Sequence, residues 1–217
     1  MKKNVFLTIV LLGILSVVLV ACGKSNSHTS STNDSPKTSK TAKNKKIALG
    51  KKSIIVFFSK PGINYEGYRK VGNTEVIARD IQKLTKSDMY QVVPKKPYPM
   101  KSYSAVEKRA TAEQKNNARP AIKNPIPSMK KYKTVFIASP VWYSELPMVM
   151  RTFMDKTDLN GKTIIPVVTD FGSGFASIPD QIKKQYPKAN VIDGFNVQGA
   201  DVQKAQPQVK KFVDGLK

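Results

Sequence analysis

Residues 134–155, T-V-F-I-A-S-P-V-W-Y-S-E-L-P-M-V-M-R-T-F-M-D, place a predicted strand, an aromatic loop and a predicted helix in direct succession. The β-branched run at residues 134–138 predicts a strand buried on both faces, and the apolar spacing that begins at Leu146 predicts a helix. In a parallel sheet the loop after such a strand lies at the carboxyl edge, where planar ligands bind. The segment therefore predicts an α/β protein with a ligand site near Trp142.

The same alternation of strands and helices continues on both sides of this segment. Strands connected by helices form a parallel sheet that is covered on both faces. We therefore predict one domain, residues 53–217, with the fold of a doubly wound, five-stranded parallel sheet in an α/β sandwich. Pro166, inside one strand, has no explanation at this level. The predicted strands are residues 53–59, 89–93, 134–138, 163–169 and 189–197, and the predicted helices are residues 74–86, with Asn73 or Thr74 as N-cap, 104–117, 146–154, 178–186 and 205–216.

Three loops of this sheet should meet at its carboxyl edge, because they follow neighbouring strands. After Ser59 the chain reaches Gly72-Asn73-Thr74 at a helix start, which suits a phosphate but is equally compatible with a plain helix cap. Pro140, Val141, Trp142 and Tyr143 follow the third strand, where the two aromatic rings could stack on a flat heterocycle or fill the core. Thr169 precedes Gly172, Ser173 and Gly174, whose amides could meet the polar edge of a ligand or simply turn into the next helix.

The N-terminus has the features of an export signal. Lys2 and Lys3 precede an apolar run at residues 5–21, and Leu19 to Gly23, L-V-A-C-G, resembles the lipobox of bacterial lipoproteins. We predict a signal peptide at residues 1–21, lipidation of Cys22 and a polar tether at residues 22–52, on the extracytoplasmic face of the membrane. A plain transmembrane anchor is the alternative, although the run is short for one. Cys22 is the only cysteine, so the chain cannot form an internal disulfide.

Charge and histidine content narrow the classes of function. Residues 1–52 carry ten lysines and one acid, so residues 53–217 keep 27 of the 37 basic and 14 of the 15 acidic side chains, a net charge of +13. For an exported protein this charge favours anionic lipid or wall polymer as partner over nucleic acid, or it is simply a solvated surface. His28, the only histidine, lies in the predicted tether, which argues against a histidine base or histidine metal site in the domain. A cofactor would then supply any catalytic reactivity.

From Ser53 to about Gly199 the chain resembles the flavodoxin-like proteins. The resemblance rests on G-N-T-E after a lengthened phosphate loop, on P-V-W-Y-S-E-L-P-M-V-M-R-T-F and on T-D-F-G-S-G-F. It implies a noncovalent FMN, and no D-x-x-T-G-A acceptor sequence indicates covalent attachment. The contacts that it implies are Ser59, Gly72, Asn73 and Thr74 at the phosphate, Pro140, Val141, Trp142 and Tyr143 at the isoalloxazine, and Thr169, Gly172, Ser173 and Gly174 at the polar edge. In the insertion, Lys60 is added as a candidate contact, while Asn64 and Tyr65 stay open.

These observations predict a membrane-tethered, FMN-binding protein that transfers electrons or acts as an oxidoreductase outside the cell, with donor and acceptor unidentified. One alternative is a non-redox basic lipoprotein that binds anionic wall polymer or a protein partner. Another is an NAD(P)H-dependent reductase of quinones or other small oxidants, although no G-x-G-x-x-G segment marks a nicotinamide site.

Overall fold

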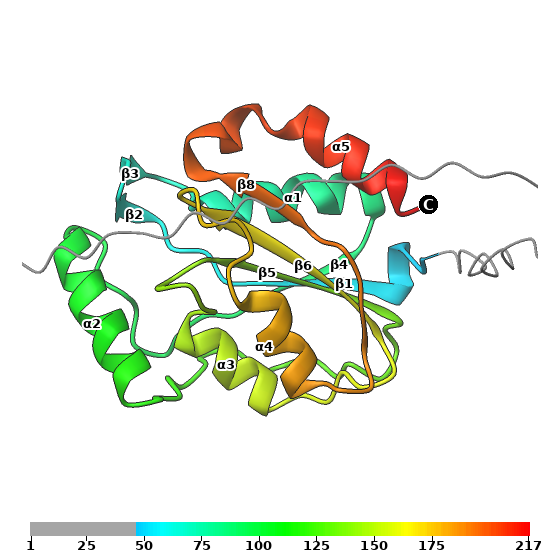
Figure 1. Cartoon of the computed structure of the whole chain (residues 1–217), viewed down its shortest axis with the longest axis horizontal. Helices are drawn as coiled ribbons and strands as arrows, with labels where there is room; N and C mark the ends of the chain where they lie inside the picture. Colours follow the sequence, from blue (N-terminus) through cyan, green and yellow to red (C-terminus); the bar gives the residue numbers. More distant parts are fainter. Residues whose placement is uncertain (1–46) are drawn as a thin grey trace, which may run out of the picture. The chain divides into compact units, whose positions relative to one another are not determined.

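The computed structural model describes residues 47–217 (Figure 1). The predicted signal peptide, Cys22 and most of the predicted tether lie outside the described residues. Ile47 and Leu49 pack against the core, and the short 3₁₀ turn η1, Gly50–Lys52, leads into the first strand. The packed part of the chain therefore begins before the predicted boundary at Ser53. Among the helices of this part, none has the length and apolar character needed to cross a membrane.

The predicted doubly wound parallel sheet is confirmed. The strand order is β4-β1-β5-β6-β7, with β8 beside β6, and every pairing in this sheet is parallel. Because the chain moves from β1 outward to β4 and then crosses to β5, the order reverses between β1 and β5, which is where ligands bind in such sheets. The strands are β1 Ser53–Phe57, β4 Asp88–Gln91, β5 Thr134–Pro140, β6 Thr163–Asp170, β7 Asn190–Val191 and β8 Phe195–Gln198, and a separate hairpin consists of β2 Gly62–Asn64 and β3 Gly67–Arg69.

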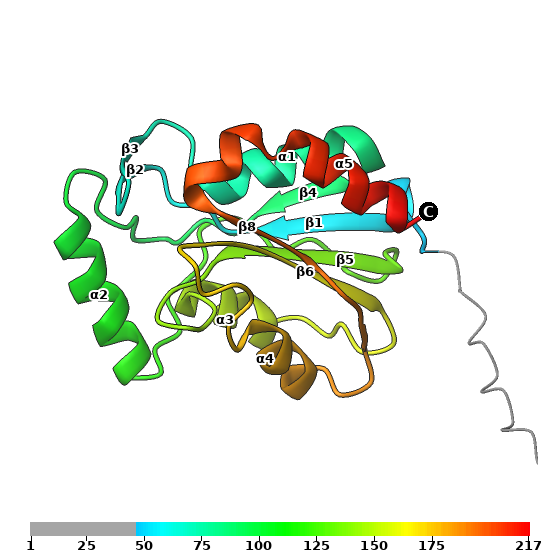
Figure 2. The same ribbon diagram turned by 45° about the horizontal axis from the view of Figure 1, so that its top comes forward.

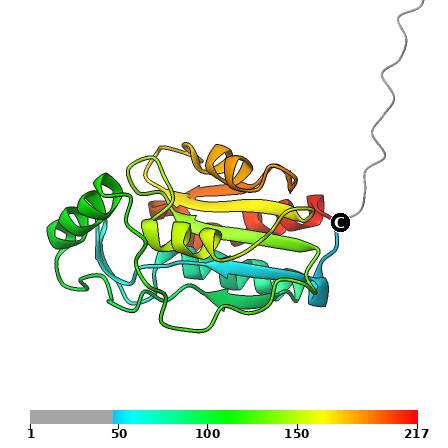
Figure 3. The same cartoon turned by 90° about the horizontal axis from the view of Figure 1, so that it is seen from below.

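Helices cover both faces of the sheet. Figure 2 shows α1 and α5 on one face and α3 and α4 on the other, while α2 lies beyond the strand ends, as Figure 3 also shows. The helices are α1 Asn73–Thr85, α2 Tyr103–Lys115, α3 Met148–Asp155, α4 Ile178–Gln185 and α5 Gln206–Gly215, with the 3₁₀ helix η2 at Gly199–Lys204. The exposed surface helix predicted at residues 104–117 is α2, in which only Val106 and Ala110 are buried.

The core consists of two apolar layers, one on each face of the sheet. Successive side chains of a strand point to opposite faces, so Ile54 and Val56 join the layer under α3 and α4, while Ile55 and Phe57 join the layer under α1 and α5. Each such buried side chain contributes about 1.5–3 kcal/mol to folding. Strands that are buried on both faces read as continuous apolar runs, which is why the sequence reveals them.

The fifth strand differs from the prediction, and the difference explains Pro166. The predicted strand at residues 189–197 is split into β7 and β8, which leave a gap beside Pro166. Ile192 N donates to Ile164 O at 3.1 Å, so even-numbered residues of β6 face this edge, and the missing N–H of Pro166 faces the gap. The proline therefore removes no ladder hydrogen bond.

Candidate functional site

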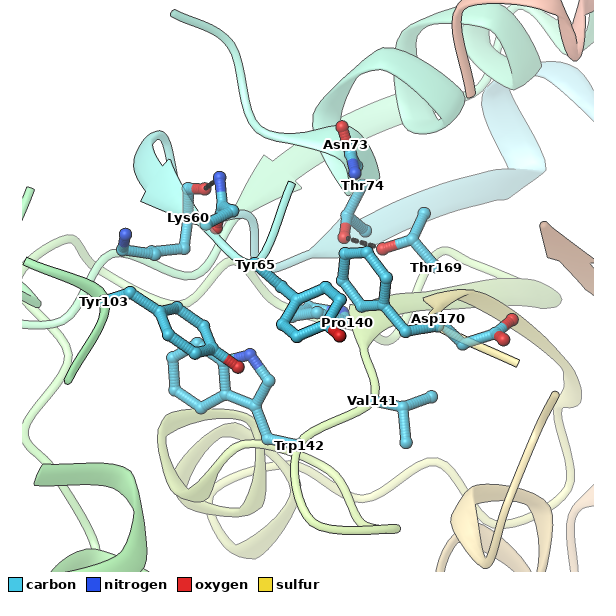
Figure 4. Close-up of a pocket in the computed structure, with 12 residues that line it drawn as sticks. Lys60, Tyr65, Asn73, Thr74, Tyr103, Pro140, Val141, Trp142, Thr169 and Asp170 are labelled. Atoms are coloured by element: carbon cyan, nitrogen blue, oxygen red, sulfur yellow. Dashed lines mark hydrogen bonds between the residues drawn. The ribbon is translucent and has the colours of Figure 1, made fainter. Parts of the chain in front are cut away.

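A cavity lies at the carboxyl edge of the sheet, at the reversal point between β1 and β5 (Figure 4). Its volume is about 100 Å³. It is lined by Lys60, Asn64, Tyr65, Asn73, Thr74, Tyr103, Pro140, Val141, Trp142, Thr169, Asp170 and Phe171. The three loops that the sequence placed at this edge therefore do meet there.

The start of α1 forms one end of the cavity. The helix begins at Asn73, and Gly72 is its N-cap, which corrects the predicted cap at Asn73 or Thr74. Ser59 does not line the cavity but supplies the missing cap, because its Oγ accepts a hydrogen bond from Glu75 N at 3.0 Å. Glu75 N and Val76 N also donate to Gly72 O. The main-chain N–H groups of Asn73 and Thr74, in the first turn of the helix, have no partner within residues 47–217.

Polar side chains surround this helix start. The buried hydroxyls of Thr74 and Thr169 lie 2.8 Å apart and join α1 to the end of β6. Within the described chain, the buried Asn73 Oδ1 has no partner. The Lys60 ammonium donates to Ile63 O, and burial lowers the pKa of this ammonium. The two free N–H groups at the helix start favour an anion, while the Lys60 ammonium is held by the hairpin.

The loop after β5 supplies an aromatic wall. Trp142 lines the cavity and also contacts the core edge-on, with ring centroids 5.4 Å from Phe58 and 4.9 Å from Tyr98. Tyr98 donates to Glu113 Oε2 at 2.6 Å, and burial, together with this bond, raises the pKa of the Tyr98 phenol. Trp142 is thus held in one orientation while it still faces the cavity.

Pro140 and Val141 lie beside Trp142 in the cavity wall, whereas Tyr143 does not line this cavity. Trp142 and Glu145 exchange two main-chain hydrogen bonds of 3.0 Å around a turn in which Tyr143 and Ser144 have positive φ. The turn directs Tyr143 toward α2, where its hydroxyl donates to Glu107 O at 3.2 Å. The structure therefore separates the two aromatic residues that the sequence grouped together.

The loop after β6 is held by hydrogen bonds to the side chain of Asp170. Asp170 is 2% exposed, and its Oδ1 accepts hydrogen bonds from Gly172 N at 2.6 Å and Gly174 N at 3.1 Å. The prediction that these glycine amides are open to a ligand is therefore wrong, and Gly172, Ser173 and Gly174 do not line the cavity. Instead, Asp170 itself lines the cavity, and its buried Oδ2 has no partner in the described part of the chain. Figure 4 shows the Asp170 carboxylate directed away from the cavity, so this side chain orders the loop after β6.

Three exposed aromatic side chains form the rim of the cavity. The Tyr65 ring lies 5.1 Å from that of Phe171 and 6.1 Å from that of Tyr103, all edge-on. They come from the hairpin turn, the loop after β6 and the start of α2, so only the tertiary structure brings them together. Sequence reasoning left Tyr65 open and did not select Tyr103, Asp170 or Phe171. Asp170 and Phe171 belong to the motif T-D-F-G-S-G-F, so the sequence pointed to their loop. Nothing in the sequence indicated Tyr103.

Comparison with known proteins identifies the family to which the chain belongs. The family model for flavodoxin matches residues 63–216. The chain belongs to the flavodoxin family. The match begins inside β2, so most of the lengthened loop lies within it.

Solved structures agree with membership of the flavodoxin family. A putative flavoprotein from Bacteroides uniformis is 24% identical with a TM-score of 0.62, over 76% of this chain and 99% of that one. One from Bacteroides eggerthii is 25% identical with a TM-score of 0.57, over 73% and 97%. A flavoprotein from Lactobacillus acidophilus, solved in complex with FMN, is 18% identical with a TM-score of 0.54, over 71% and 98%. No curated protein sequence matches the chain.

The described residues contain no alternative metal centre. Within residues 47–217, no three His, Cys, Asp or Glu side chains gather in a way that could hold a metal ion.

Proposed function

We propose that this member of the flavodoxin family binds one FMN noncovalently at the cavity and serves in electron transfer or oxidoreductase chemistry. One observation carries the proposal: the free N–H groups of Asn73 and Thr74 and the fixed Trp142 wall meet at the reversal point of the sheet. Sheets of this type bind FMN at that point. The solved Lactobacillus acidophilus relative, with FMN bound, supports the same ligand.

The residues present fit the two ends of such a ligand. Asn73 and Thr74, with Lys60 close by, would hold the phosphate, since main-chain donors and a cation are suited to it. Trp142 would lie against the flavin ring, and Asp170 would keep the loop after β6 in place beside it. When bound, FMN supplies the capacity to accept and release electrons, and the protein supplies its position and electrostatic surroundings.

Titration of the purified protein with FMN tests this proposal. A saturable change in the visible absorption spectrum, at one FMN per chain, is the expected result. If the folded protein binds no FMN, the proposal is wrong, and a non-redox role on anionic polymer or a protein partner becomes the leading hypothesis.

Replacement of Trp142 by Ala should weaken FMN binding by about 1–3 kcal/mol, or roughly 5- to 150-fold, because the ring wall is lost. Tyr143→Ala is the matched control, since Tyr143 neighbours Trp142 in the same turn but does not line the cavity. Isothermal titration with FMN measures both variants. Equal affinities for Trp142→Ala and the wild type would remove Trp142 from the site.

We propose further that the domain acts outside the cell membrane, anchored by a lipid on Cys22. The support is the sequence pattern of residues 1–23, which lie outside the described residues. Cys22→Ala should shift the protein from the membrane fraction to the soluble fraction and abolish incorporation of a labelled fatty acid. Unchanged labelling in Cys22→Ala would contradict the anchor.

A further inference from the structure

The insertion in the phosphate loop lies between Ser59 and Gly72, and its two ends are close together in space. A Cβ on Gly72 would lie 2.8 Å from Lys60 O, 2.9 Å from Lys60 C and 2.3 Å from Ser59 Oγ, so the two ends of the insertion are in contact. Ser59-Lys60 and Gly72-Asn73-Thr74 therefore form one continuous wall in space. Residues 61–71 are an excursion from a phosphate loop that is already complete.

This excursion, the hairpin of β2 and β3, is fixed in place rather than free. Ile63 N donates to Met100 O at 2.7 Å, and Gly62, with a φ of +90°, lies so close to Met100 that a Cβ would be 2.3 Å from its carbonyl oxygen. At its base, Asn64 Nδ2 donates to Gly62 O at 3.0 Å. On its far side, Glu66 Oε2 lies 2.9 Å from the position that a Cβ of Gly199 would take. The hairpin thus spans the carboxyl edge from the loop before α2 to the end of β8.

The hairpin turn holds Tyr65 over the cavity. In Figure 4 the Tyr65 ring lies among Tyr103, Pro140 and the side chains that follow β6. Tyr65 is 71% exposed, the highest value among the lining residues, and its hydroxyl makes no hydrogen bond within residues 47–217. Its contacts with Phe171 and Tyr103 are edge-on ring contacts only. Tyr65 is therefore the lining aromatic that can move at the least cost.

The cavity is small for a ligand that would fill it. Pockets that take ligands of drug size measure roughly 300–1,000 Å³, whereas this cavity has about 100 Å³. Trp142 cannot retreat, because Phe58 and Tyr98 pack behind it. The sheet edge at Pro140 is equally fixed by its pairing with Thr169. The outer rim is therefore the part of the wall that can adjust to a three-ring heterocycle.

We propose that Tyr65 gives way when the flavin enters and then packs against the ring, opposite the Trp142 wall, so that the hairpin is a specificity-determining cover of the site. The inference rests on the proposed FMN function. Tyr65 offers an uncharged ring that contacts only the rings of Tyr103 and Phe171, so its contact with a ligand is with the flavin ring and not with the phosphate. Tyr65 thus selects for a flat aromatic ligand, whether or not that ligand carries a phosphate.

Binding of FMN and of riboflavin, which lacks the phosphate, tests this inference. Tyr65→Ala should raise the dissociation constants of both ligands by the same factor, about 3- to 15-fold, because each loses one stacked ring. Tyr65→Phe should restore wild-type affinity.

Tyr68→Ala is the control, because Tyr68 lies on the same hairpin and is 62% exposed but does not line the cavity. It should bind both ligands as the wild type does. A Tyr65→Ala protein whose affinity for both ligands is unchanged, or whose affinity falls for FMN alone, would overturn the cover. If the wild type itself binds no FMN, the proposed function is wrong, a result that is visible before any variant is compared.

Discussion

Gly72→Ala should reduce FMN affinity about 100-fold and lower the free energy of unfolding by about 1–3 kcal/mol. The added Cβ would lie 2.8 Å from Lys60 O and 2.9 Å from Lys60 C, which are main-chain atoms that cannot rotate away. Either Lys60 or the start of α1 must then shift, and overpacking of this kind costs about 1–3 kcal/mol. The shift misaligns the N–H groups of Asn73 and Thr74. Two weakened bonds to a phosphate account for about 3 kcal/mol, or 100-fold in affinity.

Gly215→Ala is a suitable control for this experiment. Gly215 is the last residue of α5, and a Cβ there would meet no atom within 4 Å in the described part of the chain. Because Ala is favoured over Gly in a helix, this variant should be as stable as the wild type or slightly more so. Titration with FMN and with riboflavin completes the test, since riboflavin should lose less affinity than FMN when only the phosphate end is disturbed. Wild-type FMN affinity in a folded Gly72→Ala protein would show that the helix start does not bind the phosphate.

The sheet and the position of the site could be predicted because both follow from local patterns. Strands such as residues 134–138 are buried on both faces, so their side chains are apolar without interruption. Once the strands are parallel, the topology alone brings the loops after β1, β5 and β6 to one edge. That is why Thr74, Trp142 and Thr169 meet, although the hydrogen-bonded Thr74 and Thr169 lie 95 residues apart in sequence.

The details of the site depend on contacts that no local pattern encodes. Tyr65 reaches the cavity because the hairpin docks on Met100, and the sequence gives no sign of that contact. The amides of Gly172 and Gly174 were predicted to be free for a ligand because their bonding to Asp170 is invisible until the loop is built. Tyr143 follows Trp142 directly, yet the positive φ of its turn sends it to α2. Sequence spacing identified the loops but not the direction in which each side chain points.

Gly194→Ala should destabilise the fold at least as much as Gly72→Ala does. A Cβ on Gly194 would lie 2.0 Å from Pro166 O and 2.9 Å from Pro166 C, closer than any real contact permits, and 3.0 Å from the Phe175 ring. Pro166 belongs to β6, which β5 holds on its other side, so the edge segment between β7 and β8 must move instead. We expect a loss of about 3 kcal/mol, which for a domain of this size lowers the melting temperature by roughly 6–12 °C.

Thermal unfolding followed by circular dichroism measures this loss, again with Gly215→Ala as the neutral glycine substitution. Combining Gly194→Ala with Pro166→Val tests whether the carbonyl oxygen or the proline ring causes this loss, because Val removes the ring but leaves the carbonyl oxygen that Gly194 contacts. If close approach of the carbonyl is the cause, Pro166→Val tolerates Gly194→Ala no better than the wild type does. Restored stability in the double variant would instead assign the loss to the proline ring. A melting temperature of Gly194→Ala equal to that of the wild type would contradict the close packing of this edge altogether.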